Sequence, residues 1–153
     1  MLVVVGEKQV LVRTRVGYIW PAREEWGVAL FESRTAKFHF EYGYDRERKP
    51  KCGEILVFYH KKRLIGMVPV DEDARRTTPK DYKRHKEWDH HWKYIVGLDG
   101  TRKIMFKPPR PVEDIAEHVE VLAQAVEDGK NLHNVCRFAP GITPRDYEFL
   151  SLL

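Results

Sequence analysis

Glu54-Ile-Leu-Val-Phe-Tyr-His60 and Leu64-Ile-Gly-Met-Val-Pro-Val70, joined by Lys61-Lys-Arg63, form the stretch that decides the fold of this 153-residue chain. Two short apolar runs on either side of a charged turn are typical of a β-hairpin. The run at 55–59 is almost continuously apolar, which predicts a central strand covered on both faces. Because Pro69 has no amide hydrogen to donate, the second strand is expected to end there or to bulge.

Weaker signals for strands lie on both sides of this hairpin. Two further strand pairs are expected, at 2–5 with 10–16 and at 94–98 with 103–106. The second pair would turn at Asp99-Gly100, a dipeptide that favours tight turns. Residues 41–52 are rich in charged side chains and predict a loop.

Three stretches carry the signals of helices. Trp20-Pro21-Ala22 predicts the start of a short helix that runs towards Leu30, with Pro21 in its first turn. Residues 112–128 keep apolar side chains at helical spacing and end at Gly129. Thr143-Pro-Arg-Asp146 is typical of a capped helix start, after which Tyr147, Leu150 and Leu153 are expected to face inward. The mixture predicts one α+β domain over residues 1–153, a barrel-like mixed sheet with peripheral helices.

Composition excludes several classes of protein. The chain has 27 basic and 23 acidic residues, and its 42% hydrophobic content is too high for a disordered protein. No apolar run approaches the roughly 20 residues of a membrane-spanning helix, and no signal peptide opens the chain. Cys52 and Cys136 stand in unlike contexts, which predicts two reduced thiols. We therefore expect a cytoplasmic protein with no membrane partner. Asn, Gln and Ser occur only twice each, which favours a thermophilic source.

The basic residues are concentrated in the middle of the chain. Residues 46–109 contain 17 basic and nine acidic side chains, whereas residues 110–153 contain four and eight. The densest part is 75–86, where six cations accompany one carboxylate. Such a stretch attracts polyanions and releases counterions when it neutralises phosphates. A solvated surface is the alternative interpretation of this charge run.

Aromatic residues are also unevenly spread. Eight of the 18 lie between Tyr18 and Tyr44, and a second group occupies 88–94, directly after the basic stretch. Trp and Tyr interleaved with Lys and Arg are typical of surfaces that stack nucleobases. Packing in the core is the alternative for at least two of the four tryptophans.

Signals of catalysis are weak. The chain has no phosphate-binding glycine loop, nucleophile elbow or zinc-protease motif. Asp89-His90-His91, with His85, offers metal ligands, but the further aspartates of a two-metal site are missing. Cys136 with His133 is a possible nucleophile pair, and a buried cysteine on a strand is the favoured interpretation. We therefore expect no enzyme, no cofactor and no metal.

The order of motifs resembles the EVE domain of the PUA-like superfamily, which also includes YTH and ASCH domains. Trp26-Gly-Val28 is similar to the family's W-G-V signature, and residues 52–59 and 64–70 resemble its two following strands. The resemblance continues over nearly the whole chain, in residues 92–98, 104–109, 112–115, 134–138 (a short strand) and 143–147 (the terminal helix).

The resemblance implies a pseudo-barrel that binds RNA or DNA and accepts a modified or flipped nucleobase in an aromatic pocket. Aromatic rings would sandwich the base, and cations at the rim would hold phosphates. The residues expected to bind the base are Trp20, Trp26, Phe38, His39, Tyr42, Tyr59, His90, Trp92 and Asn134. Those expected to bind phosphate are Arg75, Arg76, Lys80, Lys83, Arg84 and Lys86.

Two other functions remain open from the sequence. One is a metal-independent RNA-processing enzyme that uses His90, His91 or His39 as general acid and base. The other is a protein–protein adaptor whose outward face is the acidic helix expected at 112–128.

Overall fold

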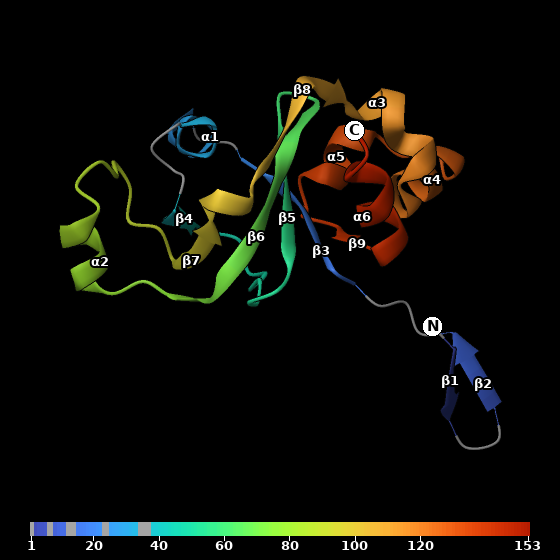
Figure 1. The fold of residues 1–153 in the computed structure, drawn as a ribbon, viewed down its shortest axis with the longest axis horizontal. Coiled ribbons are helices and arrows are strands. Elements are labelled where there is room, and N and C mark those ends of the chain that lie inside the picture. Colours follow the sequence, from blue (N-terminus) through green and yellow to red (C-terminus); the bar gives the residue numbers. More distant parts are fainter. Residues whose placement is uncertain (1, 6–7, 12–14, 23–24, 34–37) are drawn as a thin grey trace.

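The computed structural model describes the backbone of residues 2–5, 8–11, 15–22, 25–33 and 38–153, and the side chains of residues 15–22, 27–33 and 38–153. Its main sheet is a mixed one (Figure 1). Along the sheet the strands are β4 (His39–Tyr44), β7 (Tyr94–Asp99), β6 (Arg63–Arg76), β5 (Ile55–His60), β3 (Gly17–Pro21) and β9 (Gly141–Ile142), and β8 (Ile104–Pro111) pairs with β6. A separate two-stranded sheet consists of β1 (Leu2–Val5) and β2 (Lys8–Leu11).

The helices are short and fall into three groups. Figure 1 shows the helices of residues 112–150 gathered beside the sheet, while the helix of residues 79–84 lies at the far end beyond β7. The helices are α1 (Glu25–Glu32), α2 (Pro79–Arg84), α3 (Val112–Ile115), α4 (Glu120–Glu127), α5 (Leu132–Cys136) and α6 (Pro144–Leu150), with 3-10 turns η1 (Gly100–Arg102) and η2 (Ala116–His118). The α+β prediction is therefore confirmed. None of the described helices is long and apolar enough to span a membrane.

The hairpin expected at residues 54–70 is confirmed. Strands β5 and β6 are antiparallel, and Lys61 and Lys62 between them both have positive φ angles, 47° and 70°. Two such residues form the turn whose twist matches that of the flanking strands. Strand β5 lies between β3 and β6. Its side chains alternate between two hydrophobic clusters, so the expected burial on both faces is also confirmed.

Strand β6 connects the two halves of the sheet. Its pairing with β5 ends at Pro69, but the strand itself continues to Arg76. The register of its pairing with β7 is irregular between Val70 and Arg75. Of the two expectations for Pro69, an end of the strand is wrong, whereas a bulge is supported, because the register shifts begin at Val70 and carry the strand from one partner to the other.

Each face of the sheet has its own core. One cluster is rich in aromatic side chains and includes Tyr18, Trp20, Tyr42 and Tyr44. The rings of Trp20 on β3 and Tyr44 on β4 lie 4.9 Å apart although three strands separate these two in the sheet order. The sheet therefore curls towards itself. Its end strands β4 and β9 do not pair in the described residues, so the sheet is open. The second cluster lies under α3–α6.

Two segments near the N-terminal half differ from expectation. Residues 17–21 form strand β3 and α1 begins only at Glu25, so the helix expected from Trp20 is wrong. Pro21 ends the strand, and the amide of Ala22 donates to the carbonyl of Tyr59 on β5. Residues 41–44 belong to β4 and not to a loop, because Phe40, Tyr42 and Tyr44 alternate inward at strand spacing. Residues 15 and 16 lie outside any strand, and 12–14 lie outside the described residues.

Four segments further along the chain also differ. Strand β7 pairs with β4 and β6 and not with β8, since Asp99 caps the turn η1 by accepting the amide of Thr101. The helix expected at 112–128 is interrupted at Val119, which is extended and fully buried. Residues 134–136 belong to α5 and not to a strand. The capping box of α6 is confirmed, as is the burial of Leu150, but Tyr147 is 36% exposed.

Candidate nucleic-acid interface

A cavity of about 560 Å³ lies beside β4, the last strand of the main sheet. Segments that are distant in the sequence line it: β4 and the loop after it, the end of β3, the segment just before β7, and the loop between α5 and β9. The lining residues are Pro21, Tyr42, Tyr44, Asp45, Arg46, Glu47, Arg48, Trp92, Arg137 and Phe138. The cavity thus combines four aromatic side chains with three arginines.

Two arginines of the loop after β4 hold these segments together. The guanidinium of Arg46 donates to the carbonyls of Arg137, at 3.1 Å, and Pro21, at 3.2 Å. Arg48 donates through Nε to the carbonyl of Phe138, also at 3.1 Å. The guanidinium groups, whose donors have a fixed geometry, therefore join the loop after β4 to the segment before β9. Strands β4 and β9 themselves do not pair in the described residues. The cavity lies at this junction.

The guanidinium groups of the same two arginines also lie over aromatic rings. The guanidinium carbon of Arg46 lies 5.1 Å from the centre of the Trp20 ring, and that of Arg48 lies 5.4 Å from the Tyr18 ring. Both rings are buried in the aromatic core. A cation over an aromatic face is attracted by the ring quadrupole, so each side chain is pre-ordered while it keeps its charge.

The two acids of the loop are engaged with the segment around β7. Asp45 accepts the backbone amide of Lys93 at 2.9 Å, and its other oxygen lies 2.8 Å from Nε2 of His90. Glu47 accepts the hydroxyl of Tyr94 at 2.7 Å. These contacts hold the loop, which lines the cavity, against the start of β7 and the residues before it.

Tyr44 and Gly43 shape the wall formed by β4. Burial raises the pKa of Tyr44, which stays a neutral donor to the carbonyl of Arg48 at 2.8 Å. A Cβ atom built on Gly43 would lie 2.6 Å from Cδ1 of Trp92, a separation that real Cβ atoms do not show. The indole therefore packs directly on the backbone of β4, and a larger residue at position 43 would displace it.

The structure brings three of the expected base-binding residues together. Tyr42 and Trp92 line the cavity, and His90 lies beside it with its ring 4.5 Å from that of Trp92. Trp20 is fully buried beneath the cavity, where it contacts Tyr44.

The other expected base-binding residues lie elsewhere or outside the described part. Phe38 is 73% exposed and, with His39, lies at the opposite end of β4. Tyr59 belongs to the second core, and its hydroxyl lies 2.7 Å from Nδ1 of His133. Asn134 is exposed on α5. The side chain of Trp26 lies outside the described residues.

Sequence reasoning missed eight of the ten lining residues. The missed residues are Pro21, Tyr44, Asp45, Arg46, Glu47, Arg48, Arg137 and Phe138. The alternation Phe40-Glu-Tyr42-Gly-Tyr44 is a period of two and would have predicted the strand. No local signal marks the contact of Arg48 with a carbonyl 90 residues away.

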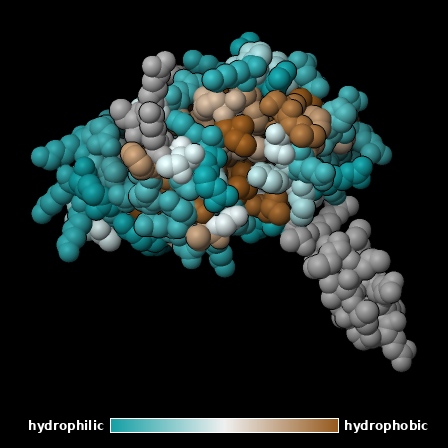
Figure 2. Space-filling view, in the orientation of Figure 1, coloured by the Kyte–Doolittle hydropathy of each residue, from teal (hydrophilic) through white to brown (hydrophobic). Residues whose placement is uncertain are grey.

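Part of the basic stretch at 75–86 is neutralised within the protein. Arg75 makes two bonds of 2.8 Å to the carboxylate of Asp81, and Arg84 makes two of 2.8 Å to Glu41. Arg84 also donates to Asp81 at 2.6 Å. The remaining expected phosphate contacts, Arg76, Lys80, Lys83 and Lys86, are exposed. Figure 2 shows that hydrophilic side chains cover this end of the molecule.

The expected nucleophile and metal alternatives find little support in the geometry. No group of three or more His, Cys, Asp or Glu side chains that could hold a metal ion occurs in the described part of the chain. Cys136 is fully buried, in α5, and burial raises the pKa of its thiol to about 12. A thiol with that pKa is almost entirely protonated near neutral pH, and so is a poor nucleophile.

This difference between the two cysteines predicts a labelling result. With DTNB near pH 8, the exposed thiol of Cys52 should react at once, and Cys136 should react only after unfolding, because burial blocks access and keeps its thiol protonated. The native protein should release about one equivalent of thionitrobenzoate and the unfolded protein two. A Cys52→Ser variant that still reacts fully in the native state would contradict this.

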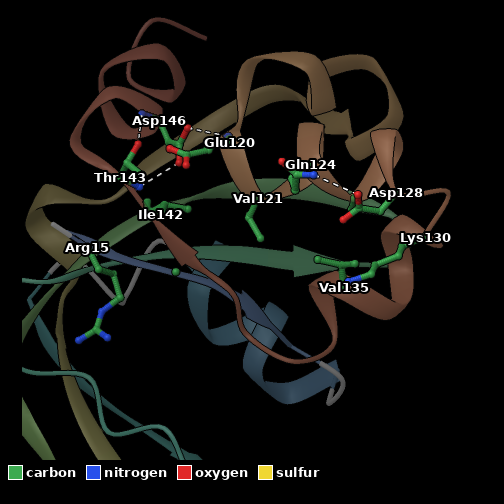
Figure 3. A pocket seen from close by; sticks show the side chains of 12 residues that line it. Arg15, Glu120, Val121, Gln124, Asp128, Lys130, Val135, Ile142, Thr143 and Asp146 are labelled. Carbon is green, nitrogen blue, oxygen red and sulfur yellow. Dashed lines mark hydrogen bonds between the residues drawn. The ribbon is translucent and has the colours of Figure 1, made fainter. Parts of the chain in front are cut away.

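A second, more apolar cavity of about 350 Å³ lies between α4, α5 and β9 (Figure 3). Several of its polar side chains already have partners within the protein. Asp146 accepts the amides of Thr143 and Glu120, and Gln124 donates to Asp128. The guanidinium of Arg15 points away from the cavity in Figure 3 and pairs with Glu54 at 3.0 Å. The side chains of Asp146, Gln124 and Arg15 are therefore already engaged within the protein, and no aromatic ring is among the described residues that line this cavity.

Comparison of the chain with protein-family models, with curated proteins and with solved structures finds no match. Any function must therefore be argued from the described residues themselves. The cavity beside β4 is the better candidate, because it alone of the two combines aromatic side chains with arginines in its lining.

Proposed function

We propose that this chain binds single-stranded RNA or DNA and holds one modified or flipped nucleobase in the cavity beside β4. The observation that carries the proposal is the lining, in which Tyr42, Tyr44, Trp92 and Phe138 accompany Arg46, Arg48 and Arg137. Aromatic faces stack any base, and arginines at the mouth hold the phosphates next to it.

The dimensions and polarity of the cavity support this ligand. A volume of about 560 Å³ lies within the range of sites that enclose small ligands. Strand β4 ends the main sheet, so half of its backbone amide and carbonyl groups point away from β7. These backbone groups offer donors and acceptors to the hydrogen-bonding edge of a base.

The proposal includes the fold of the EVE domain, a PUA-like pseudo-barrel. Support comes from the curl of the sheet, in which side chains of β3 and β4 share one aromatic core. The arginine contacts between the loop after β4 and the segment before β9 take the place of strand pairing at the opening. A base-binding cavity at such an opening is reached from solvent and walled by rigid strands.

Tryptophan fluorescence tests the proposal. Short single-stranded RNA and DNA, each with and without methylated cytosine or adenine, would be titrated into the protein at low and moderate salt. Because Trp92 lines the cavity, we expect quenching that favours one modified base and persists in added salt. If all oligonucleotides quench the fluorescence equally and added salt abolishes this quenching, base recognition is contradicted. An absence of any response would contradict binding altogether.

One contact favours a second candidate, an RNA-processing enzyme. His90 and Asp45 lie 2.8 Å apart at the mouth of the cavity, an arrangement in which a carboxylate orients an imidazole as general base. Cleavage of RNA in metal-free buffer, lost in His90→Ala, would support this function. Binding without cleavage would exclude it.

A further inference from the structure

Three exposed cations beside the cavity share an unusual environment. Arg48 lies 5.4 Å from the centre of the Tyr18 ring, and Lys49 and Arg76 lie 5.4 Å and 5.6 Å from that of Tyr94. The rings form a continuous series from Tyr18 through Trp20 and Tyr44 to Tyr94, with neighbouring centres 4.9–6.1 Å apart. We call Arg48, Lys49 and Arg76 the cation row.

The cation row differs in charge balance from the rest of the basic stretch at 75–86. None of its three members forms an ion pair with a carboxylate among the described residues. Arg75 and Arg84 both do, in bidentate contacts with Asp81 and Glu41. A cation that is already paired releases few counterions when a phosphate approaches, whereas an unpaired one contributes its full charge.

The aromatic support also lowers the cost of ordering these side chains. A free lysine or arginine loses considerable rotamer freedom when it is fixed on a phosphate. Over a ring face the side chain is already held, and its charged end still faces solvent. Lys80, Lys83 and Lys86 are exposed, and no such ring contact holds them in the described residues.

We propose that the sugar–phosphate backbone of the bound strand follows the cation row, with Arg48, Lys49 and Arg76 as its phosphate contacts. This rests on the proposed function, since Arg48 also lines the cavity and so links the base to the row. Arg76 was expected from the sequence to bind phosphate, but Arg48 and Lys49 were not. The lysines around α2 lie outside this path.

The salt dependence of binding tests the path. Anisotropy of a short fluorescein-labelled single-stranded oligonucleotide would give Kd over a series of salt concentrations for two charge-matched triple variants. Arg48→Gln/Lys49→Gln/Arg76→Gln and Lys80→Gln/Lys83→Gln/Lys86→Gln each remove three of the same kind of charge and lower the net charge equally. In the first, the slope of log K against log salt should become shallower by about 2, because each lost single-strand phosphate contact accounts for about 0.7. The second should keep the wild-type slope.

The outcomes separate this proposal from the one on which it rests. Wild-type protein that does not bind at low salt would overturn both. The path alone would be overturned if the wild type binds but the slope is unchanged in the first variant. It would also be overturned if the slope becomes equally shallow in the second variant. Because Arg48 also braces Phe138, the double variant Lys49→Gln/Arg76→Gln serves as a check, with an expected change in slope of about 1. Circular dichroism of each variant confirms that it is folded.

Discussion

Replacing Phe138 by alanine should weaken the binding of a single-stranded oligonucleotide by fivefold to a hundredfold. Loss of one stacking ring costs about 1–3 kcal/mol of binding free energy. Phe138 lines the cavity yet is 76% exposed, so its ring is available to a base and contributes little to the core. The free energy of unfolding should therefore change by less than about 0.5 kcal/mol. Fluorescence titration and urea unfolding measure the two quantities.

Phe38→Ala is the matched control for this variant. Phe38 is 73% exposed, nearly as much as Phe138, but it precedes β4 at the end opposite Tyr44. At about 3.3 Å per residue, Phe38 is roughly 13 Å along the strand from Tyr42, the nearer of the two β4 tyrosines that line the cavity, and roughly 20 Å from Tyr44. We expect Phe38→Ala to bind as the wild type does. Equal losses in both variants would show that exposed aromatic residues bind the strand without a defined pocket.

The sequence predicted aromatic residues next to cations, but not which of them the fold brings together. Tyr42 and Trp92 were expected to bind the base and do line the cavity, because aromatic residues beside cations have a chemistry that composition reveals. Phe38 and Tyr59 have the same chemistry but lie on other parts of the fold. Only the curl of the sheet decides which aromatic residues meet, and that curl depends on contacts between distant strands.

The sequence predicted secondary structure well where neighbouring residues alone determine it. The apolar runs around Lys61 and Lys62 predicted the hairpin, and Thr143 with Asp146 predicted the start of α6. The strand at 39–44 was missed because its outward Glu41 and the charges that follow resemble a loop. Val119 interrupts the expected long helix because Asp146, from another segment, accepts the amide that starts α4. Such capping from a distant residue leaves no mark in the local sequence.

Asp81→Asn should lower the free energy of unfolding near neutral pH by about 3 kcal/mol. The side chain of Asp81 is 1% exposed and accepts from Arg75, Arg84 and the amide of Thr78. Removing one partner of a buried ion pair costs about 3–5 kcal/mol, and the lower end applies because both arginines are about half exposed to solvent. Urea unfolding followed by circular dichroism measures the loss. Asp89→Asn, an exposed carboxylate in the same segment, should change stability by less than about 0.5 kcal/mol.

Asp81→Asn should also remove a pH dependence of the free energy of unfolding. Hydrogen bonds from Arg75, above all, hold the pKa of Asp81 well below its ordinary value. Because the folded state has the lower pKa, the carboxylate stabilises it fully above the unfolded value of about 4, and this contribution falls as the pH drops towards the folded pKa. The difference in unfolding free energy between wild type and Asp81→Asn should therefore be constant above about pH 5 and shrink at about pH 3. If the difference in unfolding free energy stays constant down to that pH, Asp81 stabilises the fold through its shape and neutral hydrogen bonds. Attraction between its negative charge and Arg75 and Arg84 would then contribute nothing.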